Sequence, residues 1–96
     1  MEIRKMLKIL EKEWNKTKEM TVQNQNFGET DKNKLLIICN KIIRKINNLL
    51  KIEPDEENEF EKTVVIELEK IKSLEKNFLE ILSFYKMEGV LNWSQF

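Results

Sequence analysis

The sequence predicts an all-α fold, an antiparallel bundle of three helices in which the third helix is long. Apolar residues recur at intervals of three and four along most of the 96 residues, which is the period of a helix with one buried side. The chain has only two glycines and one proline, and these fall between or after the periodic segments. No stretch alternates polar and apolar residues with a period of two, so we expect more than about 70% helix and no sheet.

The first helix is predicted over residues 2–22, and residues 23–30 are predicted as a loop because Asn and Gly favour turns. Phe27, within this loop, is expected to fold back onto the bundle. Thr30 or Asp31 is expected to cap the next helix, because a short side-chain oxygen can accept a hydrogen bond from a free N–H of the first turn. The apolar face of the first helix consists of Ile3, Met6, Leu7, Leu10, Trp14 and Thr17.

The second helix is predicted over residues 31–52. Its apolar stripe is broad enough to touch more than one neighbour, so this helix is expected at the centre of the bundle. The segment Glu53-Pro54-Asp55 ends it, because proline disfavours helical geometry at the residue before it and has no N–H to donate. The stripe consists of Leu35, Cys39, Ile42, Ile46 and Leu49, flanked by Leu36, Ile38, Ile43 and Leu50.

The third helix is predicted over residues 55–88. Six of the nine residues from 53 to 61 are acidic, and the positive end of the helix dipole favours that charge at a helix start. A helix of this length extends about 51 Å, against about 30 Å for the others. Three outcomes stay open: the helix overhangs, it bends near residues 73–77 to give four helices, or a partner such as a second copy covers its end. Its apolar face consists of Phe60, Val64, Leu68, Ile71, Leu74, Phe78, Leu82 and Tyr85.

The expected core draws on all three helices. It consists of Leu7, Leu10, Trp14, Leu35, Cys39, Ile42, Ile46, Leu49, Leu68, Ile71 and Phe78.

The last eight residues, 89–96, form a tail of unusual composition. Gly89 is expected to end the third helix, and a free terminus after it would ordinarily be polar. Four of the seven residues that follow are large and apolar instead: Val90, Leu91, Trp93 and Phe96. Either the tail folds back onto the core, or it anchors a partner protein together with Phe84 and Tyr85, since aromatic side chains dominate binding hot spots.

The formal net charge is zero, but the two halves of the chain differ. Residues 1–52 carry twelve basic and six acidic side chains, and residues 53–96 carry five and eleven. Either the basic helices neutralise the acidic one, or they form a face for nucleic acid or anionic lipid. Acidic residues interrupt this face and only two arginines are available to read bases, so a protein partner is favoured over nucleic acid. The candidate basic residues are Lys5, Lys8, Lys12, Lys16, Arg44 and Lys45.

The composition excludes most catalytic chemistry. Without histidine and with one cysteine, the chain can form neither an intrachain disulfide nor a structural zinc site, and Cys39 has no base to activate it. There is no glycine-rich phosphate loop, so no cofactor, metal or catalytic residue is expected. No apolar run reaches the ~18–20 residues of a transmembrane helix, and the N-terminus lacks a signal-peptide core. We therefore expect a cytoplasmic, non-enzymatic protein that binds another protein.

Two short segments resemble the bacteriocin immunity proteins of lactic acid bacteria and their relatives. They are Val64-Val65-Ile66-Glu67-Leu68 in the long helix and the closing Trp93-Ser94-Gln95-Phe96. The resemblance implies a cytosolic helical bundle that protects a bacteriocin producer from inside, at the bacteriocin's receptor complex, commonly the mannose phosphotransferase permease. It implies contacts only for the tail residues. That family usually has four antiparallel helices, whereas three are predicted here.

An alternative function follows from the codon preference that the composition reflects. Lys outnumbers Arg fifteen to two, which is typical of a low-GC bacterium or of one of its mobile elements. A phage- or plasmid-encoded inhibitor of a host protein, anti-CRISPR proteins included, would have the same features. A small nucleic-acid-binding helical protein is the second alternative.

Overall fold

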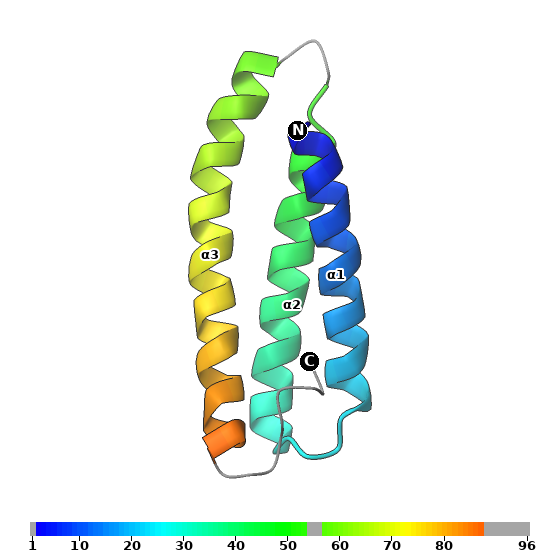
Figure 1. The fold of residues 1–96 in the computed structure, drawn as a ribbon, viewed down its shortest axis with the longest axis vertical. Coiled ribbons are helices and arrows are strands. Elements are labelled where there is room, and N and C mark those ends of the chain that lie inside the picture. Colours follow the sequence, from blue (N-terminus) through cyan, green and yellow to red (C-terminus); the bar gives the residue numbers. More distant parts are fainter. Residues whose placement is uncertain (1, 54–56, 88–96) are drawn as a thin grey trace.

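The computed structural model describes residues 2–53 and 57–87, and these form a bundle of three helices (Figure 1). The helices are α1 (Ile3–Gln23), α2 (Glu29–Leu50) and α3 (Glu57–Met87), with consecutive helices antiparallel. They contain 21, 22 and 31 residues, and no strand occurs in the described ranges. The bundle is elongated, measuring 49 × 22 × 19 Å. The predicted all-α fold and the long third helix are confirmed.

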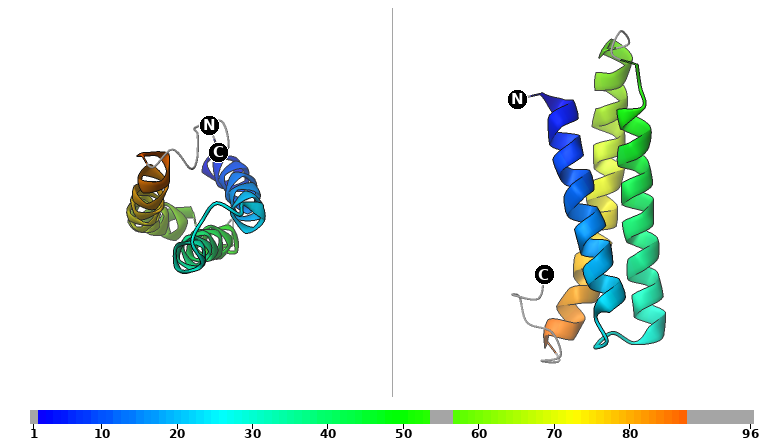
Figure 2. Two further views of the ribbon diagram at one scale, coloured as in Figure 1. Left: turned by 90° about the horizontal axis from the view of Figure 1, so that it is seen from below. Right: turned by 90° about the vertical axis from the view of Figure 1, so that its right-hand side faces the viewer.

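The core is centred on α2, which packs against both other helices, as its broad apolar stripe predicts. α1 and α3 approach each other less closely than either approaches α2, and the view along the bundle shows them on either side of it (Figure 2). Most of the predicted core is buried, but Leu10 and Leu68 are only partly buried. Phe27 is buried, as expected. The core also contains four residues of the predicted apolar face of the third helix that were not in the expected core: Phe60, Val64, Leu82 and Tyr85.

α3 is one continuous helix through residues 73–77, so residues 2–53 and 57–87 form three helices rather than four. It does not overhang either, because its buried face runs from Phe60, 1% exposed, to Tyr85, 8% exposed. At one end the Arg4 guanidinium lies 4.0 Å from the centre of the Phe60 ring. At the other end Tyr85 packs edge-on against Phe27, with ring centroids 5.0 Å apart. The first two helices and their loop therefore cover α3, and its length no longer requires a second copy.

The loop between α1 and α2 is held by its own polar groups. The Asn24 N–H donates to the Met20 carbonyl at 3.0 Å, which closes α1. The Asn26 N–H then donates to the Asn24 side-chain oxygen at 2.8 Å, forming a local turn of the kind that Asn favours.

α2 begins at Glu29, two residues earlier than predicted, with Gly28 as its N-cap. The expected cap by Thr30 or Asp31 is wrong, because both residues lie inside the helix and no side chain caps it. The Asp31 carboxylate instead accepts a hydrogen bond from the Tyr85 hydroxyl at 2.6 Å. This partner lies 54 residues away in the sequence, so the local pattern could not reveal it.

The remaining helix ends differ slightly from the prediction. α2 ends at Leu50, and the Lys51 N–H donates to the Asn47 carbonyl at 3.2 Å. α3 begins at Glu57, so Glu59 lies in its first turn, where the helix dipole favours a negative charge. The predicted breaker Pro54 and the predicted C-cap Gly89 lie outside the described residues.

Candidate protein-binding groove

An apolar groove of about 370 Å³ lies between α1 and α3. It exists because these two helices stand further apart from each other than from α2, so side chains rather than backbone bridge the space. We call it the α1–α3 groove. Its apolar lining consists of Leu10, Trp14, Met20, Phe78, Leu79 and Leu82.

Two aromatic rings form the rigid part of the groove. Trp14 of α1 and Phe78 of α3 meet edge to face, with centroids 5.3 Å apart and an interplanar angle of 88°. Both side chains are buried, at 8% and 2% exposed, so they are held by the core. Leu79, the next residue of α3, is 46% exposed. The groove therefore combines a fixed aromatic base with an apolar side chain that the described residues leave half in solvent.

The polar part of the groove lining is acidic. Glu13 and Glu75 line the groove, and no basic side chain does so among the described residues. Thr17, also in the lining, uses its hydroxyl within α1, donating to the Glu13 carbonyl at 2.9 Å. The groove thus presents apolar surface and two carboxylates, a combination that suits an apolar segment carrying a basic group.

Of the two predicted contact residues of α3, Tyr85 is buried and Phe84 is exposed. The Tyr85 hydroxyl donates to Asp31 and accepts from the Gly28 N–H at 2.9 Å. The hydrogen bond to Asp31 raises the pKa of Tyr85, and the Gly28 N–H opposes this shift. Because its ring is buried and its hydroxyl is used within the chain, Tyr85 is not available as a partner contact. Phe84 is 57% exposed and lies edge-on to Tyr85, with centroids 5.5 Å apart.

The four apolar tail residues predicted as partner contacts lie outside the described residues. They are Val90, Leu91, Trp93 and Phe96. In the described chain, Leu82 of the groove lies five residues before the last residue of α3, Met87.

The residues of the predicted basic face lie in two separate places. Those of α1 are all exposed along that helix: Lys5, Lys8, Lys12 and Lys16. Arg44 and Lys45 instead line a cleft between α2 and α3. The six residues therefore do not form one continuous surface, and the sequence alone did not reveal that Lys70 and Ser73 of α3 would join Arg44 and Lys45 in that cleft.

The single thiol is part of the core. Cys39 is 0% exposed, and burial raises its pKa to about 11, although the charge of Lys18 acts in the opposite direction. The thiol is therefore protonated at neutral pH, and a thiol is a far weaker nucleophile than a thiolate. In the part of the chain that the structure describes, no group of acidic or cysteine side chains is arranged to hold a metal ion.

No protein-family model, no curated protein and no solved structure matches the chain. Across residues 2–53 and 57–87, no helix has the length and apolar character needed to cross a membrane.

Proposed function

We propose that the chain is a non-enzymatic binding protein that takes an apolar segment of a partner protein into the α1–α3 groove. The observation that carries this proposal is the half-exposed Leu79 beside the buried pair of Trp14 and Phe78. A concave apolar site with a few polar groups, held in shape by the core, is the usual form of a binding site. An elongated groove between two helices suits a helical or extended segment with apolar residues on one side.

The charges of the groove define the partner segment further. Glu13 and Glu75 place negative charge within the lining, and a basic residue on the partner would meet it. Such complementary charge favours encounter and selects among partners more than it adds affinity. The proposed partner segment is therefore apolar and carries at least one Lys or Arg.

The tail is proposed as the second half of the binding surface. Leu82 of the groove lies about 7–8 Å along α3 from Met87, since a helix rises about 1.5 Å per residue. We propose that Val90, Leu91, Trp93 and Phe96, which follow α3 in the sequence, contact the same partner segment. Phe84, exposed near the end of α3, lines a separate hollow with Asp31 of α2, so it does not belong to the groove itself.

The biological role we propose is self-immunity against a bacteriocin. The resemblance of the tail and of residues 64–68 to immunity proteins supports it, and so does the all-α fold, although the described residues form three helices where that family usually has four. The partner would then be the cytosolic side of a membrane receptor complex. An inhibitor from a mobile element, which would act on a different host protein, could use the same groove.

The test is survival of a sensitive low-GC host that expresses either the intact chain or a chain truncated after Gly89. Both strains are challenged with the bacteriocin encoded nearest this gene, and the helical content of both proteins is compared by circular dichroism. We expect the intact chain to protect and the truncated chain to remain helical but fail. Equal killing of both strains would contradict immunity against that bacteriocin and favour the inhibitor. Unfolding of the truncated chain would show that the tail belongs to the core.

A further inference from the structure

A second concave surface lies between α2 and α3, and it is basic where the α1–α3 groove is acidic. This cleft has a volume of about 540 Å³. Four of its lining side chains are cations and none is an anion: Lys41, Arg44, Lys45 and Lys70. The two acids of α2, Glu29 and Asp31, lie in its first turn, and residues 32–52, which include the part of α2 that lines the cleft, contain no Asp or Glu.

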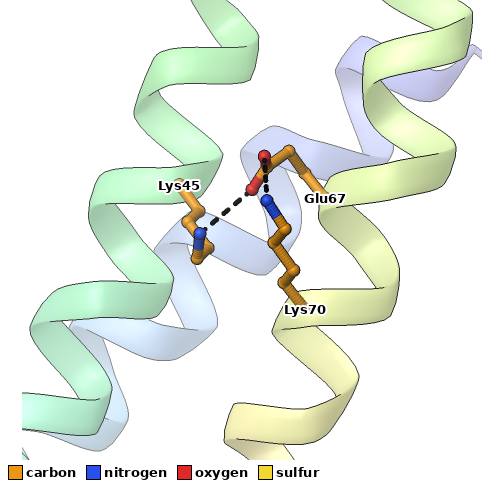
Figure 3. A network of polar contacts seen from close by, with 3 residues as sticks. All are labelled: Lys45, Glu67 and Lys70. Atoms are coloured by element: carbon orange, nitrogen blue, oxygen red, sulfur yellow. Dashed lines mark hydrogen bonds and ion pairs between the residues drawn. The ribbon is translucent and has the colours of Figure 1, made fainter.

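One carboxylate outside the lining holds two of the cations in place (Figure 3). Glu67 of α3 lies 3.1 Å from the Lys45 ammonium across the cleft and 3.4 Å from the Lys70 ammonium on its own helix. Both lysines lower the pKa of Glu67, chiefly through the hydrogen bond from Lys45, so the carboxylate is ionised at neutral pH. Each ammonium has three N–H donors and gives one of them to Glu67, which leaves donors for a second anion.

The other polar side chains of the cleft are donors as well. Lys41, Arg44, Lys45 and Asn48 follow one another at intervals of three, one and three residues, so they share one side of α2. Ser73 lies three residues after Lys70 on the facing side of α3. A guanidinium, ammonium groups, an amide and a hydroxyl are the donors that bind phosphate oxygens. The chemistry of the cleft therefore suits an oxyanion, and a phosphate offers more acceptor oxygens to these donors than a carboxylate does.

Exposed isoleucines next to the cleft indicate where that phosphate resides. Ile37 is 54% exposed and precedes Lys41 by one helical turn; Ile66 is 57% exposed and precedes Lys70 by one turn. Because α2 and α3 are antiparallel, the two isoleucines lie toward opposite ends of the cleft. A soluble phosphate needs no such apolar neighbours, and single-stranded nucleic acid would need aromatic rings to stack its bases. Cations flanked by exposed aliphatic side chains are instead typical of a surface that lies in the membrane interface.

We propose that the α2–α3 cleft binds the headgroup phosphate of an anionic phospholipid, with Ile37 and Ile66 entering the interface on either side. The chain then rests on the membrane surface with α2 and α3, which leaves the α1–α3 groove open to a protein. This inference does not depend on the proposed function, because it rests on other residues and is tested with lipid alone.

The experiment measures binding of the intact protein to vesicles rich in phosphatidylglycerol and to vesicles of pure phosphatidylcholine. We expect binding only to the first. Replacing two exposed cations of the cleft, Lys41→Gln with Arg44→Gln, should weaken binding about 30-fold, because each basic side chain at an anionic surface contributes about fivefold. The matched control, Lys8→Gln with Lys12→Gln, removes the same charge from exposed positions of α1 and should cost less than about threefold, since charges away from the membrane are screened. Equal losses in both variants, or no binding to phosphatidylglycerol, would overturn the proposal.

A second pair of variants separates a lipid from other phosphate sources. Ile37→Gln should weaken vesicle binding by at least about threefold through lost apolar burial, while Val22→Gln, at a position of α1 that is 50% exposed, should not. Inorganic pyrophosphate is added in a separate titration, followed by the amide resonances of Asn48 and Ser73. Shifts there without vesicle binding would replace the lipid with a soluble phosphate ligand. Cleft-dependent binding to a DNA duplex at physiological salt, without vesicle binding, would replace it with nucleic acid.

Discussion

Replacing Tyr85 by Phe isolates the polar link between the end of α3 and the start of α2. The change removes the hydroxyl and keeps the ring, so the edge-on contacts with Phe27 and Phe84 are preserved. Two hydrogen bonds are lost: the one donated to Asp31 at 2.6 Å and the one accepted from the Gly28 N–H at 2.9 Å. The first involves a charged group and is worth about 1.5–3 kcal/mol, and the second about 0.5–1.5 kcal/mol. Asp31 is partly exposed and Gly28 is exposed, so in the variant water can form hydrogen bonds with both groups and offset part of this loss. We therefore expect the free energy of unfolding to fall by about 2 kcal/mol in total.

Urea unfolding followed by circular dichroism measures this loss, and thermal unfolding should show a midpoint lower by about 10 °C for a chain of this size. Asp31→Asn is the matched control, because an amide oxygen still accepts the hydrogen bond but without the charge; it should lose about half as much. A Tyr85→Phe variant as stable as the parent would show that the Tyr85 hydroxyl does not stabilise the fold. The hydroxyl would then again be a candidate contact for a partner.

The pH dependence of the same variant follows from the direction of the pKa shift. The pKa of Tyr85 is raised above its ordinary value of 10.0, so the folded state favours the protonated phenol. The stabilisation is therefore fully present below the pKa of the unfolded state and is lost as pH rises through the higher pKa of the folded state. We expect the difference in unfolding free energy between parent and variant to be constant through neutral pH and to shrink in strong alkali.

Three further predictions concern the core and the surface. Ile46→Ala should cost about 2–5 kcal/mol in urea unfolding, because the side chain is 0% exposed, whereas Ile37→Ala at an exposed site should change stability by less than about 0.5 kcal/mol. Cys39 should react with a disulfide reagent at neutral pH only as fast as the protein opens, and rapid reaction of the folded protein would contradict its burial. Glu67→Gln should cost at most about 1 kcal/mol at neutral pH. Lys45 lowers the pKa of Glu67 in the folded protein, so the stabilisation by Glu67 is fully present above the ordinary carboxyl pKa of 4.5 and disappears as pH falls through the lower pKa of the folded state. A Glu67→Gln variant that is destabilised equally at neutral and at acidic pH would contradict this.

The sequence predicted the fold well because helix periodicity is a local property. Ile42 and Ile46 lie on the centre of a stripe that only one orientation of α2 can bury, and both are 0% exposed. The spacing from Phe60 to Tyr85 has the period of a single helix but left a bend near residues 73–77 open, and α3 is continuous there. The same local reasoning predicted Asp31 as a possible helix cap, whereas its carboxylate accepts a hydrogen bond from Tyr85, which lies 54 residues away in the sequence.

The candidate sites depend on how helices are placed relative to one another, which periodicity does not encode. Phe78 is buried as predicted and Leu10 is only partly buried, and both also line a groove because α1 and α3 stand apart. The only sequence signal for the groove was apolar residues just off the main stripes, such as Met20 and Leu79. The basic cleft also depends on helix placement. Arg44 and Lys45 were predicted as basic-face residues, but Lys70 lies opposite them because α2 and α3 are antiparallel and Lys45 pairs with Glu67 across them.

The central claim, that the α1–α3 groove receives a partner segment, is tested most directly by Leu79→Lys beside Val65→Lys in the survival assay. Both positions are exposed on α3, at 46% and 66%, but only Leu79 lines the groove. Lysine is a good helix former and both sites reach solvent, so both variants should keep their stability within about 0.5 kcal/mol. We predict that Val65→Lys protects the host as the parent does and that Leu79→Lys does not, because it places a charge where the partner's apolar side chains must pack. Full protection by a folded Leu79→Lys protein, in a host that the parent protects, would contradict the account.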